Sequence, residues 1–136
     1  MHTTQPRGAV ALITNSRGEY LLHLRDDIDG VVWPGHWSLL GGGCEPGETP
    51  RQAVVRELQE EAELVLPELT ELCEAPDTLG SGLLVTFFTG TWDGDAGALP
   101  LHEGQKLDWF APRLLDSLPI PPFARRVLND HRAAGI

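Results

Sequence analysis

Three glutamates, Glu57, Glu60 and Glu61, lie at positions i, i+3 and i+4 of one segment. In a helix this spacing places the three carboxylates on one face, where each pair repels by roughly 0.2–0.5 kcal/mol. Such a face is most often simply solvated. It can also hold a hard cation such as Mg²⁺, which prefers oxygen ligands and completes its shell with water and phosphate oxygens. The spacing therefore indicates either a solvated acidic face or a metal site.

A glycine-rich loop precedes these glutamates and favours the metal site. Glycines at 41–43 and at 47 flank Glu45 and Glu48, and a backbone without side chains can approach a cation or a phosphate closely. Arg56 directly precedes the first of the three glutamates, and its guanidinium can form two parallel hydrogen bonds with a loop carboxylate. We expect Glu48 to be that partner, so that the pair joins the loop to the helix.

Residues 42–64 read G-G-C-E-P-G-E-T-P-R-Q-A-V-V-R-E-L-Q-E-E-A-E-L and resemble the Nudix box, G-x5-E-x7-R-E-U-x-E-E-x-G-U, in which U is a bulky apolar residue. The matching positions are Gly42, Glu48, Arg56, Glu57, Leu58, Glu60, Glu61 and Leu64. The stretch is also similar to the MutT branch of that family, which hydrolyses oxidised nucleoside triphosphates. Glu63 stands where the box has its second glycine, so we expect the helix either to continue towards Val65 or to end in a strained turn.

The resemblance implies roles for individual residues. The metal ligands that it implies, for Mg²⁺ or Mn²⁺, are the Gly41 carbonyl and the carboxylates of Glu57, Glu60 and Glu61. Glu48 and Arg56 would orient the loop, and Glu57 would in addition activate water. Because a glutamate from a later loop sometimes contributes to this step in the family, Glu103 is a further catalytic candidate. The alternative for Glu103 is a solvated loop acid.

The activity that the resemblance implies is metal-dependent hydrolysis of a phosphoanhydride bond in a nucleoside diphosphate linked to a further group. A nucleoside triphosphate, including a modified deoxynucleotide, would give the monophosphate and pyrophosphate. A sugar nucleotide or a dinucleotide is the alternative substrate. Two readings from other classes stay open: a non-catalytic Nudix-fold sensor that binds nucleotide, and a purely structural acidic helix.

Aromatic residues outside the box are candidates for binding the substrate. Trp33, His36, Trp37 and Phe123 could stack on a base or close a pocket. Tryptophan is also common in protein cores, and Trp37 fits a core position because it lies in an expected strand. Ala124 follows a Pro-Pro-Phe stretch near the C-terminus, where the MutT branch has an asparagine that reads guanine. This difference argues against guanine readout by that group.

The elements that must position these residues alternate irregularly between strands and helices. Runs of β-formers separated by turn residues predict strands at 7–14, 19–25, 37–40, 69–73, 83–92 and 107–111. Thr49 and Gln52 can form a capping box, so a helix should begin there and end near Ala62 or Leu64. A second helix is predicted at 122–134. The pattern and the resemblance indicate an α/β (α+β) fold, a Nudix-type α/β/α sandwich with a mixed sheet flanked by helices.

The first helix should be amphipathic. On a helical wheel Val55, Leu58 and Ala62 share one side, with Val54 at its edge, and we expect this stripe to face the core. Ala53 lies beside the acidic face. We expect its small side chain to leave room there for a metal and a phosphate.

Length and composition indicate one domain, which we expect to be a single Nudix domain over residues 1–136 with its box at 42–64. A net charge of −10 argues against a nucleic-acid duplex as the main partner, because phosphate binding needs a basic surface. It is compatible with a small-molecule nucleotide substrate if cations bridge the acids and the phosphates.

The remaining expectations concern location and assembly. No apolar run is long enough to span a membrane, and the N-terminus shows no apolar core of a secretory signal, so we expect a cytoplasmic protein without a membrane partner. In that compartment Cys44 and Cys73 are better read as buried free thiols than as a disulfide. The apolar run 83–88 could form either a central strand or the edge of a homodimer.

Overall fold

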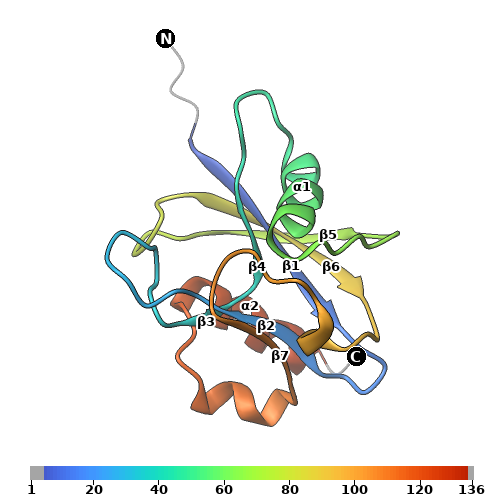
Figure 1. Ribbon diagram of the computed structural model, residues 1–136. Helices are drawn as coiled ribbons and strands as arrows, with labels where there is room; N and C mark the ends of the chain where they lie inside the picture. Colours follow the sequence, from blue (N-terminus) through green and yellow to red (C-terminus); the bar gives the residue numbers. More distant parts are fainter. Residues whose placement is uncertain (1–4, 135–136) are drawn as a thin grey trace.

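Strands make up the centre of the molecule, of which the computed structural model describes residues 5–134 (Figure 1). The seven strands in this part of the chain are β1 (Arg7–Thr14), β2 (Tyr20–Leu24), β3 (Trp37–Ser38), β4 (Leu40–Gly43), β5 (Thr70–Pro76), β6 (Leu84–Thr91) and β7 (Lys106–Phe110). They form one sheet with the path β3-β2-β1-β6-β5, to which β4 is joined through β1 and β7 through β2. The strand predictions are therefore confirmed, with boundary shifts of one to three residues and a break between β3 and β4.

The sheet is mixed because β1 has both antiparallel and parallel neighbours. It pairs antiparallel with β2 and β4 and parallel with β6, and the pairs β2–β3, β2–β7 and β5–β6 are antiparallel. This confirms the predicted mixed sheet. Since β6 is paired on one side with β1 and on the other with β5, the run 83–88 forms a central strand, and the alternative of a dimer edge there is wrong.

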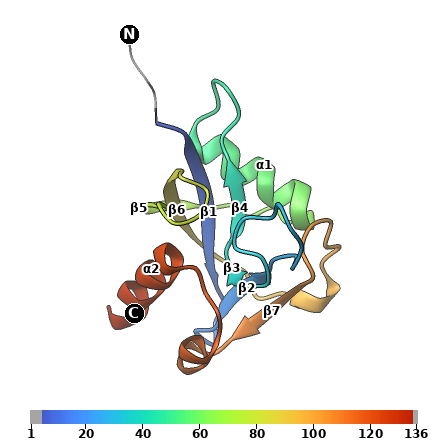
Figure 2. The ribbon, with the colours of Figure 1, turned by 90° about the vertical axis from the view of Figure 1, so that its left-hand side faces the viewer.

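Two helices cover opposite faces of the sheet, as Figure 2 shows: α1 (Pro50–Ala62) lies on one side and α2 (Pro122–Ala133) on the other. Short 3₁₀ helices lie at Ala96–Ala98, between β6 and β7, and at Pro112–Ser117, between β7 and α2. β1 contributes side chains to the hydrophobic core on both faces of the sheet. Ala9, Ala11 and Ile13 belong to the core cluster under α1. Val10 and Leu12 belong to the cluster under α2. The predicted α/β/α sandwich is confirmed. Neither helix within residues 5–134 has the length and apolarity needed to cross a bilayer.

The ends of α1 follow local sequence signals. The Thr49 side chain accepts a hydrogen bond from the backbone N–H of Gln52, and the Gln52 side chain accepts one from the Thr49 N–H, which completes the expected capping box. At the other end Glu63 adopts a left-handed conformation (φ 52°) and its N–H donates to the Gln59 carbonyl. Of the two expected exits, the structure has the strained turn, which costs a non-glycine residue roughly 1–2 kcal/mol.

The face of α1 that packs on the sheet includes Val54, Leu58 and Ala62, as predicted, but it is rotated so that Val55 lies outside it. Ala53 is fully buried in the core rather than beside a metal and phosphate, whereas Val55 is 50% exposed. The buried positions are Ala53, Val54, Leu58, Glu61 and Ala62. Apolar pattern alone gave the wrong rotation, because it treated Glu61 as a solvent-facing residue and so moved the expected core stripe towards Val55.

The two cysteines are free. Cys44 follows β4 and Cys73 lies in β5, and both are partly exposed rather than buried.

Candidate metal centre and substrate pocket

Glu61 is buried between α1 and the sheet and is 2% exposed. One of its oxygens, Oε1, accepts a hydrogen bond of 3.0 Å from the backbone N–H of Gly41 in β4. Burial raises the pKa of Glu61 well above its ordinary range, and the negative charges of Glu57 and Glu103 raise it further. A carboxylate in this position is stabilised in its charged form only by a nearby cation or by more donors.

Two adjacent glycines of β4 each leave space for a neighbouring group, one on the helix and one in the sheet. At Gly42, an added Cβ would lie 2.8 Å from the Cδ of Glu57, so the missing side chain makes space for that carboxylate. At Gly41, where φ is 148°, an added Cβ would lie 2.1 Å from the carbonyl oxygen of Ala9 in β1. Gly42 is thus required by the carboxylate of Glu57, and Gly41 is required by the close packing of β4 against β1.

Glu103 completes an acidic cluster with Glu57 and Glu61. Each of the three offers a carboxylate oxygen, and these oxygens lie within 4.8 Å of one another. Glu103 comes from the loop before β7, so the cluster joins the helix to a segment some forty residues further along the chain. The suggestion that Glu103 belongs to the site therefore agrees with its position, although its role is still a prediction.

Glu60 lies outside this cluster. Its side chain is 58% exposed, and its carboxylate accepts a hydrogen bond of 3.1 Å from Nη1 of Arg56. It still lines the same pocket. Of the four predicted ligands, the structure brings the carboxylates of Glu57 and Glu61 together with the backbone of Gly41, while Glu60 faces the guanidinium.

Arg56 joins the glycine-rich loop to the helix, as expected. Its Nε and Nη2 donate to the two oxygens of Glu48, each at 2.8 Å, and Nη2 also donates to the Gly43 carbonyl at 3.0 Å. Nη1 donates to Glu57 at 2.9 Å. The guanidinium lowers the pKa of Glu48 to about 2, so this carboxylate is charged over the whole physiological range. The pair holds the loop and Glu57 in one arrangement.

His23 in β2 lies beneath the cluster, 1% exposed, and sequence reasoning did not single it out. Its Nε2 is 2.7 Å from the carbonyl oxygen of Glu103; a carbonyl only accepts, so Nε2 carries the hydrogen. Its Nδ1 faces Glu61 at 3.9 Å. Burial lowers the pKa of His23 and favours the neutral ring. Gly104 fits against this ring, because an added Cβ there would lie 2.0 Å from Nε2.

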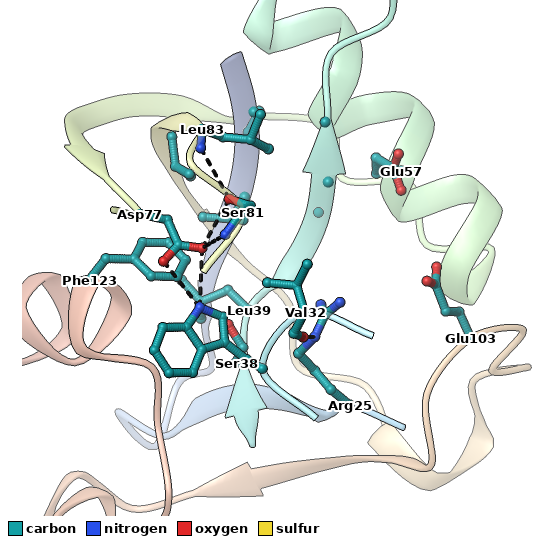
Figure 3. A pocket seen from close by; sticks show the side chains of 18 of the residues that line it. Arg25, Val32, Ser38, Leu39, Glu57, Asp77, Ser81, Leu83, Glu103 and Phe123 are labelled. Carbon is teal, nitrogen blue, oxygen red and sulfur yellow. Dashed lines mark hydrogen bonds between the residues drawn. The ribbon is translucent and has the colours of Figure 1, made fainter. Parts of the chain in front are cut away.

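A pocket of about 380 Å³ opens beside the cluster, and Figure 3 shows Glu57 and Glu103 at one end of it and Asp77 and Phe123 at the other. Both of these ends belong to one cavity, whose floor is formed by β1 and β4. Trp33 and Phe123 line it, as expected for substrate-binding candidates.

His36 and Trp37 are not among the residues that line this pocket. The ring of Trp37 packs edge-on against Phe110, with 4.8 Å between the ring centroids, on the core side under α2. The rings of His36 and Trp33 pack edge to face, with 5.3 Å between their centroids. Trp37 is therefore a packing residue. His36 does not line the pocket, but it packs against Trp33, which does.

Comparison with known proteins bears on the origin of this arrangement. A family model described as the NUDIX domain matches residues 4–131 of the chain. The chain belongs to the Nudix family. This match confirms the family that the box at residues 42–64 indicated.

Individual relatives in the Nudix family agree with this assignment. Nucleoside triphosphatase NudI of Enterobacter sp. (strain 638) is 47% identical over 55 residues, which are 40% of this chain and 38% of that protein. The chain spans less than half the length of the curated relatives that it matches. The solved structure of MutT from Aliivibrio salmonicida and Vibrio cholerae is 27% identical, with a TM-score of 0.77, over 96% of this chain and 99% of that one.

A second Nudix structure shares the fold alone. The Nudix domain of Shewanella oneidensis NrtR, solved with ADP ribose, superimposes with a TM-score of 0.79 over 99% of this chain and 91% of that one, at 18% identity. The same fold is thus found in a protein described as MutT and in a Nudix domain solved with ADP ribose.

The Nudix family implies a divalent cation, and the donor set of this chain fits one. Three carboxylates whose oxygens lie within 4.8 Å of one another repel strongly unless a cation lies between them. Oxygen ligands of this kind suit Mg²⁺ and Mn²⁺. Glu57 and Glu61 would hold the ion, with the Gly41 carbonyl as a predicted further ligand and the Glu103 carboxylate beside them.

Proposed function

We propose that this Nudix chain is a Mg²⁺- or Mn²⁺-dependent pyrophosphohydrolase. It cleaves a phosphoanhydride bond in a nucleoside diphosphate linked to a further group, and its main substrate is a nucleoside triphosphate or a modified deoxynucleoside triphosphate, which gives the monophosphate and pyrophosphate. We also propose that residues 1–136 form a single Nudix domain. One observation supports this function above the others: Glu57 and Glu103, two members of the three-carboxylate cluster, lie at one end of a pocket whose other end holds Phe123 and Asp77, the hydrogen-bond partner of Trp33.

The layout of the pocket suits a nucleotide. A cation bound at the cluster neutralises phosphate charge and lowers the pKa of water. The acidic end would otherwise repel the phosphates, so this end must receive them together with a cation. The aromatic end offers faces for a flat ring, and the pocket of about 380 Å³ joins the two ends without a break.

We assign the general base to Glu103. Glu57 already accepts a hydrogen bond from Arg56, which occupies one of its oxygens. Within residues 5–134 no donor binds the carboxylate of Glu103, and His23 fixes only its backbone carbonyl. The Glu103 side chain is therefore free to accept a proton from water, while Glu57 and Glu61 serve as ligands. Arg56 and Glu48 keep Glu57 in place throughout.

Hydrolysis of a sugar nucleotide or another dinucleotide is the second candidate. It is favoured by the fold shared with a Nudix domain that holds ADP ribose, and by the loop at 26–36, whose residues Val32 and Trp33 form part of the pocket wall. A nucleotide sensor without catalysis is the third reading. The presence of Glu57, Glu61 and Glu103 in one cluster argues against it, because a sensor has no need of the complete set.

A substrate panel tests the proposal. Purified protein is incubated with nucleoside triphosphates, oxidised deoxynucleotides, sugar nucleotides and ADP ribose, with Mg²⁺ and with EDTA, and pyrophosphate and monophosphate are quantified separately. We expect pyrophosphate from triphosphates only when Mg²⁺ is present, and loss of this product in Glu57→Gln and Glu61→Gln. Cleavage confined to sugar nucleotides or ADP ribose would favour the second candidate. Binding without cleavage would favour the sensor.

A further inference from the structure

A buried carboxylate lies at the end of the pocket away from the metal centre. Asp77, at the end of β5, is 3% exposed and lines the cavity. The indole N–H of Trp33 donates to both of its oxygens at 3.1 Å. Ser81 donates to Oδ2 through its backbone N–H at 2.9 Å and its hydroxyl at 3.0 Å. Oδ1 thus receives only its share of the indole hydrogen bond.

The charge of Asp77 is not matched by a basic side chain. Across residues 5–134, no lysine, arginine or histidine nitrogen lies within 4 Å of its carboxylate. A carboxylate has about four acceptor positions, and a buried charge is unfavourable unless hydrogen bonds satisfy it. Oδ1 therefore keeps capacity for a further donor, and the pocket is the space from which a donor can come.

The residue that binds Asp77 is itself strained. Trp33 has φ 53°, in the left-handed region that bulky residues rarely adopt. Gly80 leaves room for its indole, since an added Cβ there would lie 2.2 Å from Nε1. Strained residues of this kind cluster at ligand sites. A strained tryptophan and an anion without a basic partner in one pocket wall point to a ligand that makes use of both.

We propose that this end of the pocket reads the nucleobase and selects bases with an exocyclic amino group. The base lies against Trp33 and Phe123, and Oδ1 of Asp77 accepts a hydrogen bond from the amino group at position 4 of a pyrimidine or position 6 of a purine. A keto oxygen in the same place would face the carboxylate and be repelled. This inference rests on the proposed function, since it assumes that the metal centre receives the phosphates.

Matched substrate pairs test the inference. The pairs dCTP with dUTP and dATP with dITP differ in an amino or a keto group at the position concerned and in the adjacent ring nitrogen, which carries a hydrogen only in the keto member. For the wild-type protein with Mg²⁺, we expect kcat/KM to favour the amino member by about tenfold to a hundredfold, as for one hydrogen bond to a charged acceptor. In Asp77→Asn the amide oxygen can still accept from Ser81, which places the NH₂ group at the position of Oδ1. The preference should therefore fall to about one or reverse.

Two further variants separate base reading from simple support of Trp33. Trp33→Phe and Ser81→Ala each remove a donor to Asp77 but keep its carboxylate. We expect both variants to bind nucleotides less tightly and yet to keep the amino preference. If Trp33→Phe loses the preference as Asp77→Asn does, Asp77 only supports the tryptophan and the inference is overturned.

The wild-type ratio is decisive even if Asp77→Asn does not fold. Cleavage of both members of each pair at equal kcat/KM overturns base reading by Asp77 and leaves the pyrophosphohydrolase intact. Absence of any cleavage of the four triphosphates with Mg²⁺ overturns the proposed function itself. An amino preference in the wild type that Asp77→Asn abolishes supports the inference.

Discussion

Replacing Gly42 by alanine tests the role of Glu57, because the three atoms nearest the new methyl group all belong to that carboxylate. The added Cβ would lie 2.8 Å from Cδ and 2.9 and 3.0 Å from the two oxygens of Glu57. Carbon atoms in favourable contact lie about 3.5–4.0 Å apart, so the carboxylate must move by roughly 1 Å. A misplacement of about 1 Å can lower a rate by about 10²-fold. We therefore expect kcat to fall by about that factor.

The same substitution should leave the fold nearly unchanged. The contacted atoms are the end of a flexible side chain, and a forced rotamer costs about 0.5–1.5 kcal/mol. Alanine in a strand recovers about 0.5–1 kcal/mol relative to glycine. These two terms nearly cancel, so the free energy of unfolding of Gly42→Ala should lie within about 1 kcal/mol of the wild-type value.

The assay combines steady-state kinetics at saturating Mg²⁺ with urea unfolding followed by circular dichroism. Gly43→Ala is the matched control in the same strand, because its added Cβ meets only Leu83 Cδ1, at 3.8 Å. It should lose far less turnover than Gly42→Ala. Wild-type turnover in folded Gly42→Ala would refute the assignment of Glu57. A loss of turnover that merely follows a loss of stability would refute the claim that only the carboxylate is displaced.

Further predictions concern the surroundings of the cluster. Gly41→Ala should unfold the protein rather than only inactivate it, with a loss of about 2–4 kcal/mol in urea melts, because its Cβ meets backbone and its φ is positive; a stable variant would contradict this. Arg56→Lys cannot donate two parallel hydrogen bonds to Glu48, and kcat should fall by roughly tenfold; unchanged kcat would show that the pair does not hold the site. Because the pKa of Glu48 is lowered to about 2, its stabilising effect is complete above the ordinary carboxyl value of 4.5 and is lost as pH falls towards 2. The stability difference between wild type and Glu48→Gln should therefore shrink over that window, and a constant difference in urea melts would contradict the pairing. His23→Leu leaves the Glu103 carbonyl without its donor and should cost about 1–3 kcal/mol and lower kcat more than it changes KM; His23→Gln, whose amide can donate at the same place, should recover part of both.

Local signals explain why much of the fold follows from the sequence. The capping box of Thr49 and Gln52 defines the start of α1, and the continuous apolar run of β1 accounts for its two buried faces. The pairing of Arg56 with Glu48 was also predictable, because both occupy fixed positions of the Nudix box and a guanidinium can form two parallel hydrogen bonds with a carboxylate. These features depend on neighbours in the chain or on the spacing within one motif.

Tertiary packing explains what the sequence alone missed. A helical wheel treats Glu57, Glu60 and Glu61 as one face, and only the docking of Ala53 and Val54 on the sheet shows that Glu61 is buried and Glu60 is outside. Contacts between distant segments were equally hidden. Glu103 reaches the cluster because a histidine in an apolar strand binds its carbonyl, and the carboxylate of Asp77 has no local motif that marks it as part of the pocket.

The central claim is that the cation is bound by Glu57 and Glu61, beside Glu103, and not on the helix face with Glu60. Titration of the protein with Mn²⁺, followed by calorimetry or by the loss of the free-ion electron paramagnetic signal, tests it without any substrate. Glu61→Gln keeps the shape of the side chain and should weaken Mn²⁺ binding by roughly tenfold or more, whereas Glu60→Gln should leave affinity close to that of the wild type. Equal affinity in wild type and folded Glu61→Gln, or a larger loss in Glu60→Gln, would contradict the assignment.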